Sequence, residues 1–283
     1  MKIIEVNLNK CTKCKLCLSA CPANLFSFQN DCINFQDPNH WCIKCGHCLA
    51  ICPAQAVEYD LSPSYREYSK NIPHQLLNLL NQRSIRNYSE EQVSPEKIEF
   101  ILEAMRYSAS GHNLQGCKYI VIKDRKVQLA LSDFTIKAMK KFLVLIKLRY
   151  FIKLFIPSIL FELLNDPSTS VGIKSMISDY EKGKDVIFFY APLVILIYYP
   201  EMGEMSLIDP IIAATNGIHA AHLLGLGSCW MGFVMQAIAK SKKIKKILGI
   251  PKNYRICAVF TLGYPQLNYS RIPPRKKIKV NYI

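Results

Sequence analysis

Eight of the chain's twelve cysteines fall into two copies of one pattern. In each copy the thiols stand at C-x2-C-x2-C-x3-C, and a proline follows the last one. The copies are Cys11, Cys14, Cys17 and Cys21, and Cys42, Cys45, Cys48 and Cys52. Three thiolates at this spacing can surround one corner of an iron–sulfur cubane, and the fourth cysteine ligates the other cluster. We therefore expect one 4Fe–4S cluster on Cys11, Cys14, Cys17 and Cys52, and a second on Cys42, Cys45, Cys48 and Cys21.

Two other uses of the eight thiols fit the sequence less well. Zinc sites favour paired C-x2-C knuckles with a longer gap between them. A disulfide framework expects a signal peptide, and the first ten residues, MKIIEVNLNK, lack its apolar region. Residues 1–60 resemble two-cluster bacterial ferredoxins, and their motifs repeat with a period of 31 residues, from Cys11 to Cys42.

Length, composition and charge indicate a second domain of a different kind. The chain has 283 residues, of which 50% are hydrophobic and 20% charged, so a globular domain with its own core follows the cluster motifs. Twelve cysteines without a signal peptide indicate a reducing cytoplasm, and the clusters suggest an anaerobe. The net charge is +15, and residues 1–60 hold five groups of each sign, so the basic excess lies later. Such an excess can attract nucleic acid or anionic lipid, but we interpret it as phosphate handling together with a solvated basic surface, and no nucleic-acid-binding motif is present.

A second set of polar residues comes from segments that are far apart in the chain. It comprises Arg83, Ser84 and Arg86; Ser110, Asn113 and Gln115; Gly232; and Arg275 with Lys276. In order and spacing these segments, together with Gly263–Tyr264–Pro265, resemble the nitroreductase family of FMN flavoproteins. The resemblance covers about residues 79–283, although residues 130–185 match no motif.

The resemblance implies a role for each residue of the second set. A guanidinium fork and a hydroxyl suit a phosphate dianion, which assigns Arg83, Ser84, Arg86, Arg275 and Lys276 to the FMN phosphate. The donors and acceptors of Ser110, Asn113 and Gln115 suit the edge of the isoalloxazine ring, and Gly232 allows a backbone N–H to approach its N5 atom. The family also implies a homodimer with the flavin at the subunit interface. No catalytic acid is assigned.

The chain departs from the family pattern at three places. Gln82 precedes Arg83 where many members have a second arginine, and Gly116–Cys117 follows Gln115 where Pro-Trp is usual. Met231 stands where some members have glutamate. Plainer interpretations also remain open: Arg83 and Arg86 could pair with Glu90 and Glu91, and Asn113 and Gln115 could be ordinary loop caps.

An insertion with an amphipathic character is expected at about residues 134–185. Lysines and arginines interleave with Phe, Leu and Ile between residues 137 and 155, too often for a spanning helix, and Pro157 should break or kink the helix. We favour a lid or dimer-packing helix, with a membrane-surface helix as the alternative.

The predicted fold is α+β, with a ferredoxin-like domain at 1–60, a linker at 61–78, and a nitroreductase-like mixed sheet flanked by helices at 79–283. The predicted activity is that of an FMN-dependent oxidoreductase fed by two fused clusters. A reduced ferredoxin or another low-potential donor loads the clusters, and the acceptor is a small electron-poor molecule such as a nitroaromatic, quinone, enone or flavin. The alternative is a redox-sensing or electron-buffering protein without a dedicated substrate, free or membrane-associated. No nucleic-acid partner is expected.

Overall fold

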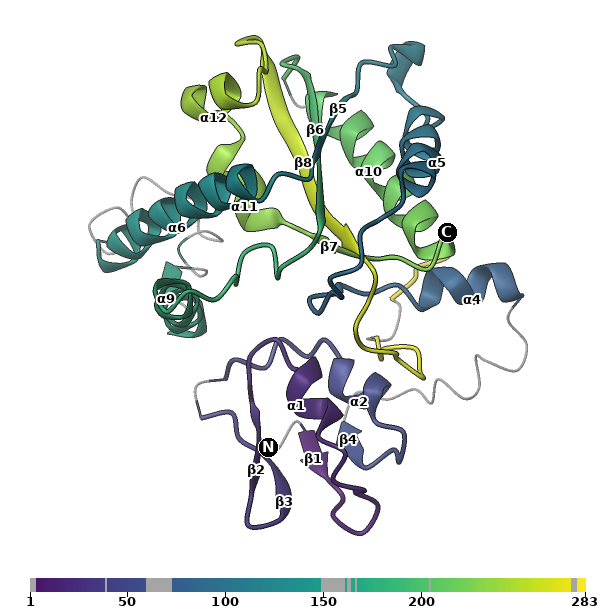
Figure 1. Ribbon diagram of the computed structural model, residues 1–283, viewed down its shortest axis with the longest axis vertical. Helices are drawn as coiled ribbons and strands as arrows, with labels where there is room; N and C mark the ends of the chain where they lie inside the picture. The colour runs from purple at the N-terminus through teal and green to yellow at the C-terminus, as the bar shows by residue number, and fades with distance from the viewer. Residues whose placement is uncertain are drawn as a thin grey trace. The chain divides into compact units, whose positions relative to one another are not determined.

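The chain folds into two compact units (Figure 1). The computed structural model describes residues 4–38, 40–59, 73–148, 161, 164–165, 167–203, 205–275 and 279–283. The N-terminal unit comprises Met1–Arg83 together with Gln266–Ile283, and the sheet unit comprises Ser84–Pro265. The sequence-based boundaries placed Gln266–Ile283 in the second domain. These residues group with the first unit instead, because Ser270 and Arg271 bond its second short helix.

The described part of the N-terminal unit is built from two pairs of short strands and three short helices. Its pairs are antiparallel: β1 (Ile4–Val6) with β4 (Val57–Tyr59), and β2 (Phe26–Gln29) with β3 (Cys32–Phe35). Its helices are α1 (Leu16–Ala20), α2 (His47–Ile51) and, later in the chain, α4 (His74–Leu80). The buried thiols of Cys17, Cys48 and Cys52 pack in one apolar cluster with Ile33 and Val57. The candidate cluster ligands therefore form part of this unit's core.

The sheet unit contains a four-stranded sheet in the order β5-β6-β8-β7. Its strands are β5 (Lys118–Ile122), β6 (Leu193–Pro200), β7 (Gly227–Trp230) and β8 (Tyr254–Gly263), and each neighbouring pair is antiparallel. We expected a mixed sheet. Among the described residues the parallel contribution is the single bridge between Ser84 and Ser228, beside β7.

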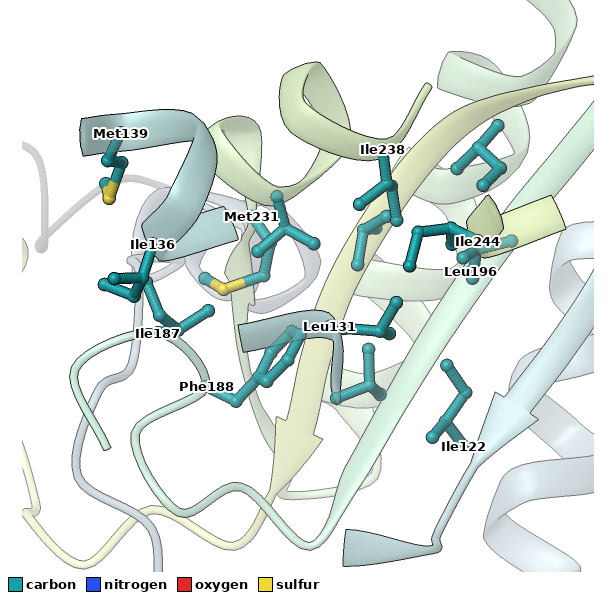
Figure 2. Packing of buried hydrophobic residues seen from close by; sticks show 14 of the residues in the cluster. Ile122, Leu131, Ile136, Met139, Ile187, Phe188, Leu196, Met231, Ile238 and Ile244 are labelled. Atoms are coloured by element: carbon teal, nitrogen blue, oxygen red, sulfur yellow. The ribbon is translucent and has the colours of Figure 1, made fainter. Parts of the chain in front are cut away.

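Helices cover both faces of this sheet because β6 is apolar on both of its sides. Leu193, Ile195 and Ile197 pack into one core cluster with α5 (Pro95–Arg106) and α10 (Met205–Leu223), whereas Val194 and Leu196 pack into the other. Alternation of successive side chains across a strand explains this division. The second face carries α6 (Arg125–Lys147), α9 (Pro167–Glu181), α11 (Gly232–Ile238) and α12 (Lys242–Ile247). Figure 2 shows side chains of this second core, with Leu131 of α6 and Ile238 of α11 pointing in toward Leu196.

Two of the expected helical features have clear physical causes. Ser94 caps α5, since its hydroxyl accepts a hydrogen bond from the backbone N–H of Lys97 at 3.4 Å. Gly217 lets α10 approach α5 closely, because a Cβ atom there would lie 2.7 Å from the Cγ and Sδ atoms of Met105.

The predicted insertion begins as the long helix α6, which starts before residue 134 and packs into the second core through Leu131, Ile136 and Met139. Its other side exposes apolar groups, among them Val144 and Leu145. Residues 149–160, which include Pro157, and residues 61–72 of the predicted linker lie outside the described residues. No helix in the described part of the chain has the length and apolar character needed to cross a bilayer.

Candidate functional site

The cysteine repeat is also a repeat of backbone conformation. Lys13 and Lys15 of the first motif adopt positive φ angles of 58° and 61°, and their counterparts 31 residues later, Lys44 and Gly46, have φ angles of 54° and 72°. A left-handed residue reverses the local course of the chain, so each loop turns its thiols toward one side. Each loop then enters a short helix, α1 or α2.

The fourth cysteine of each motif ends its helix in an extended conformation, with ψ near 110° at Cys21 and Cys52. The fourth cysteine therefore lies at the far end of the helix from the loop that begins its motif. Burial raises the pKa of the Cys17 thiol to about 11, and the neighbouring thiols of Cys14, Cys52 and Cys11 add to that shift.

The second quartet of thiols follows the same pattern. Burial raises the pKa of the Cys48 thiol, with Cys45, Cys21 and Cys42 as the neighbours that raise it further. The structure therefore brings together the quartets that the spacing predicts, each with three thiols from one motif and one from the other. Their role as cluster ligands remains a prediction.

Each quartet supplies the four thiols that a 4Fe–4S cluster requires, one for each iron corner. Among the described residues, no group of three or more His, Cys, Asp or Glu side chains lies close enough to hold a single metal ion. Two of these sulfurs also accept backbone hydrogen bonds: Cys52 Sγ from the N–H of Ala56 at 3.3 Å, and Cys21 Sγ from that of Leu25 at 3.5 Å.

Asp37 supports the second loop and was not anticipated from the sequence. Its carboxylate accepts hydrogen bonds from the backbone N–H groups of Trp41 at 2.6 Å and Cys42 at 3.1 Å. An acidic residue four or five positions before a cysteine motif is the signal that could have indicated this support.

Arg83 presents an uncompensated positive charge. Its Nε donates to the carbonyl of Asn81 at 3.0 Å and one Nη to that of Arg271 at 2.9 Å, whereas the buried Nη1 has no hydrogen-bond partner among the described residues. Burial lowers the pKa of Arg83 to about 10, with Tyr269 opposing the shift and the charge of Arg275 adding to it. A buried donor beside a second cation is the arrangement that an anion would stabilise.

Arg275 lies in the same unit as Arg83, and the structure brings the two guanidinium groups into each other's electrostatic range. Arg275 is exposed, and its Nη1 donates to the carbonyl of Pro274 at 3.1 Å. Lys276, the other predicted phosphate ligand of this segment, lies outside the described residues.

Ser84 and Arg86 lie in the sheet unit beside β7. The backbone N–H of Ile85 donates to the carbonyl of Ser228 at 2.8 Å, which fixes this segment along the strand. Burial raises the pKa of the Cys229 thiol, while the charge of Arg86 and a hydrogen bond with Ser84 oppose that shift. Both residues therefore face Cys229 on β7.

The arginines do not pair as the plainer interpretation requires. Among the described residues, neither Arg83 nor Arg86 forms an ion pair with Glu90 or Glu91. Arg86 instead lies over the ring of Phe189, 5.8 Å from its centroid.

The loop with Ser110, Asn113 and Gln115 has a strained but well-bonded backbone. Asn113 and Gln115 have positive φ angles of 54° and 47°, which cost free energy in non-glycine residues. The hydroxyl of Ser110 accepts from the N–H of Gln115 at 3.1 Å, and the side-chain amide of Gln115 donates to that of Asn113 at 2.9 Å. Asn113 and Gln115 are exposed, so their remaining donors and acceptors face solvent.

A buried pair anchors this loop to α10. The Asp209 carboxylate accepts from the backbone N–H of Gly111 at 3.1 Å and from the hydroxyl of Tyr199 at 2.8 Å. Gly116 packs against the Tyr199 ring, since a Cβ atom there would lie 2.8 Å from its Cε2 atom. Neither Asp209 nor Tyr199 was a predicted site residue. An acid inside an apolar, small-residue helix is the signal that could have pointed to Asp209.

Gly232 begins α11 directly after Met231. A Cβ atom at Gly232 would meet nothing closer than Trp230 Cδ1, at 3.9 Å, so the protein's own packing does not require glycine there. Met231 is buried, as the apolar departure from the family pattern suggests.

Two family models match the chain in the predicted order. Residues 10–64 match the 4Fe-4S dicluster domain, and residues 79–264 match the nitroreductase family. The second match spans more than half of the chain, so the chain belongs to the nitroreductase family. It is a nitroreductase-family oxidoreductase with an iron–sulfur domain in front, and the fusion predicted from the sequence is confirmed.

Known relatives agree with this assignment. A protein of Archaeoglobus fulgidus named as an NADH dehydrogenase/NAD(P)H nitroreductase is 30% identical over 189 residues, which are 66% of this chain and 83% of that protein. An FMN-bound nitroreductase from Desulfitobacterium hafniense superimposes with a TM-score of 0.56 at 20% identity, over 75% of this chain and 99% of that one. An FMN-dependent nitroreductase from Clostridium difficile gives 0.53 at 22% identity, over 74% and 99%. These two structures show the shared fold.

Proposed function

We propose that this protein is an FMN-dependent oxidoreductase in which two 4Fe–4S clusters supply the electrons that reduce a small electron-poor molecule. The acceptor classes are those predicted from the sequence: nitroaromatics, quinones, enones or another flavin. When bound, each cluster carries one electron and FMN takes two, so single electrons from a low-potential donor become a two-electron reduction of the acceptor. One observation supports this proposal most directly. Eight thiols lie in two quartets, each with three thiols from one motif and one from the other, in a chain that also has the nitroreductase sheet.

The thiols are suited to bind iron because of their surroundings. Burial without a neighbouring cation raises the pKa of Cys17 to about 11 and also raises that of Cys21, Cys42 and Cys48, so these groups are protonated in the metal-free chain near neutral pH. Iron must displace these protons, since the thiolate is the ligand. The backbone N–H groups of Leu25 and Ala56 then stabilise the thiolate charge on Cys21 and Cys52.

The flavin phosphate is assigned to Arg83 and Arg275, with Lys276, Ser84 and Arg86 as the further predicted ligands. The buried Nη1 of Arg83 supports this assignment, since it has no partner in the described chain and a phosphate oxygen would supply one. The charge of Arg275 supports it too, because it lowers the pKa of Arg83, and a dianion near both guanidinium groups would offset that repulsion.

The ring edge is assigned to Ser110, Asn113 and Gln115, and the close approach to the ring to Gly232. The loop is held by Asp209 and Tyr199, so its exposed amides are fixed before a ligand arrives. Fixed donors lose little entropy on binding, which favours affinity.

A homodimer is part of the proposal. Ile208, Ile211 and Ile212 recur at helical spacing on α10, and their side chains are 55%, 44% and 37% exposed. An apolar stripe of this kind on a central helix suits a second copy of the chain, as the family implies.

Anaerobic preparation tests the cofactors first. Iron, sulfide and FMN are counted per chain in the wild type, in Cys14→Ser and in Cys32→Ser, which removes a thiol outside both motifs. We expect eight irons per chain, as two 4Fe–4S clusters hold, with reduced iron only in Cys14→Ser. A preparation that lacks either the clusters or FMN after reconstitution would refute the proposal.

Anaerobic stopped-flow then tests the electron route. Dithionite reduces the clusters, and the absorption band of the oxidised flavin is followed with time in the wild type, Cys14→Ser and Cys32→Ser. The band should bleach quickly in the wild type and Cys32→Ser and more slowly in Cys14→Ser. Equal rates in all three would show that the clusters do not feed the flavin, and bleaching without turnover on any acceptor class would favour the electron-buffering alternative.

A further inference from the structure

The segment Tyr269–Pro274, here called the tail strap, binds the end of helix α2 within the N-terminal unit. The Arg271 guanidinium donates to the carbonyl of Leu49 and, at 2.5 Å, to that of Cys52. Ser270 donates to the carbonyl of Ala50 twice, from its backbone N–H at 3.1 Å and from its hydroxyl at 3.3 Å. These carbonyls belong to the last turn of α2 and its C-cap, where a helix lacks intrahelical donors and carries partial negative charge.

Other contacts of the strap hold Arg271 in place. The Tyr269 ring packs edge-on against His47, the first residue of α2, with 5.3 Å between ring centroids. The Arg83 guanidinium lies over the ring of Tyr269, 4.4 Å from its centroid, and also donates to the carbonyl of Arg271. The Arg271 charge is thus fixed by neighbours on both sides instead of moving freely in solvent.

The strap breaks the symmetry between the two cysteine motifs. Gly46, before α2, lies so close to Pro274 that a Cβ atom there would be 2.2 Å from its Cδ atom. The equivalent residue before α1 is Lys15, whose side chain lies over Phe28 instead. Glycine at position 46 therefore opens the second motif to the strap, and the first motif has no such opening.

The bonded carbonyl of Cys52 belongs to a predicted cluster ligand. Cys52 and Cys17 are buried in one apolar cluster against which Cys11 packs, and the thiols of Cys14, Cys52 and Cys11 all add to the raised pKa of Cys17. A positive charge bonded to the backbone of Cys52 lies a few covalent bonds from its sulfur. The two described bonds of the Arg271 guanidinium end on Leu49 and Cys52, and of these two residues only Cys52 is a predicted cluster ligand.

We propose that Arg271 sets the reduction potential of the cluster ligated by Cys52 and thereby makes the two clusters unequal. Reduction adds a negative charge to a cluster, and a fixed cation beside one ligand stabilises the reduced form. Hydrogen bonding and net charge near the sulfurs are the established controls of such potentials. Arg271 is a positioning and tuning residue in this scheme and touches no substrate. The inference rests on the ligand assignment proposed above.

The test is an anaerobic redox titration of both clusters, followed by electron paramagnetic resonance, in the full-length loaded protein. Cys14→Ser identifies the signal of the cluster that contains Cys52. Arg271→Gln removes the charge, Arg271→Lys keeps it, and Lys279→Gln is the matched control, since it removes one charge from an exposed residue further along the same tail. In Arg271→Gln we expect a tenfold less favourable reduction of the Cys52 cluster, a fall of about 59 mV for a one-electron couple. The other cluster should shift much less, and Arg271→Lys should stay nearer the wild type than Arg271→Gln.

Several outcomes would overturn the proposal. It is wrong if Arg271→Gln and the wild type have the same two potentials, or if Lys279→Gln produces the same shift. If Arg271→Gln does not retain its clusters, Arg271→Met and Arg271→Ala replace it. Loss of clusters from all three neutral variants, with Arg271→Lys fully loaded, would assign Arg271 a structural role and refute the tuning. Iron and sulfide counts on the wild type test the cluster assignment separately, so its failure would be recognised as such.

Discussion

The buried carboxylate of Asp209 should be the most sensitive single support of the flavin-side loop. Its side chain lies in α10 and is 6% exposed, and its two described partners are the backbone N–H of Gly111 and the hydroxyl of Tyr199. Truncation to alanine leaves both donors buried and without this acceptor. A hydrogen bond to a charged group contributes about 1.5–3 kcal/mol, so Asp209→Ala should lower the free energy of unfolding by about 4 kcal/mol.

Two milder substitutions separate the contributions of the two hydrogen bonds to the lost free energy of unfolding. Tyr199→Phe removes one donor and should cost about 2 kcal/mol, and Asp209→Asn, which retains one acceptor oxygen, should cost a similar amount. The matched control is Asp133→Ala. Asp133 accepts from the hydroxyl of Tyr180 at 2.9 Å, the same chemical pair, but on the exposed surface of α6, where the expected cost is below about 1 kcal/mol.

The chain allows the sheet unit to be monitored by itself. Its two tryptophans are Trp41 in the N-terminal unit and Trp230 in the sheet unit, so a Trp41→Phe background leaves Trp230 as the reporter of the sheet unit. Urea unfolding followed by Trp230 fluorescence gives the free energies. FMN affinity, measured by quenching of flavin fluorescence, should fall about tenfold in Asp209→Ala, because the loop is no longer fixed before binding.

The reasoning is refuted if Asp209→Ala costs no more than Asp133→Ala. It is also refuted if Asp209→Ala destabilises the sheet unit by about 4 kcal/mol but binds FMN as tightly as the wild type. In that case the anchor supports the fold without preparing the loop.

Three further predictions follow from the described contacts. Arg83→Gln should weaken FMN binding at least tenfold and leave riboflavin, which lacks the phosphate, unchanged; an equal loss for both flavins would exclude Arg83 as the phosphate ligand. Ile211→Glu should convert a dimer to a monomer of 32.3 kDa in light scattering, whereas Ile247→Glu, on the exposed surface of α12, should not; a dimer that survives Ile211→Glu places the interface elsewhere. Burial and then Asp209 raise the pKa of Tyr199 to about 12, above its unfolded value near 10, so this group's contribution to stability is complete below pH 10 and is lost between pH 10 and 12. Tyr199→Phe should reduce that alkaline loss in urea midpoints at pH 9 and 11, and an unchanged loss would contradict the assignment.

The cysteine quartets could be predicted because their information is local. A three-residue period of thiols followed by proline defines a loop, and the 31-residue repeat supplies the crossed partner without knowledge of the rest of the fold. The strands were also predictable as apolar runs, since β6 and β8 are buried over nearly their whole length. Strand direction was not predictable in this way. A run that is apolar on both faces is typical of parallel sheets, whereas β6 and β8 pair antiparallel, and their two apolar faces reflect the helices that cover both sides of the sheet.

The supporting residues could not be predicted because their partners are remote. Gly111 and Asp209 are 98 positions apart, and Arg271 and Cys52 are 219 apart. Asp209 looks like an isolated acid in a helix, and Arg271 like one cation in a basic tail. Such contacts carry no motif, since any acceptor brought to the right place by the fold would serve.

The two ends of the sheet unit lie side by side, and this has a consequence for how the protein is made. The N–H of Ser89 donates to the carbonyl of Tyr264 at 2.9 Å, and Tyr88 forms a bridge with Pro265. The sheet unit is therefore an insertion that interrupts the N-terminal unit for 182 residues, Ser84–Pro265. Arg271 follows Cys52 by 219 residues. At a translation rate of roughly 5–20 residues per second, about 11–44 seconds separate synthesis of the second cysteine motif from synthesis of the tail strap. During that interval the end of α2 lacks the hydrogen bonds that Ser270 and Arg271 donate to it, so the surroundings of the second motif are complete only after the flavoprotein portion has been made.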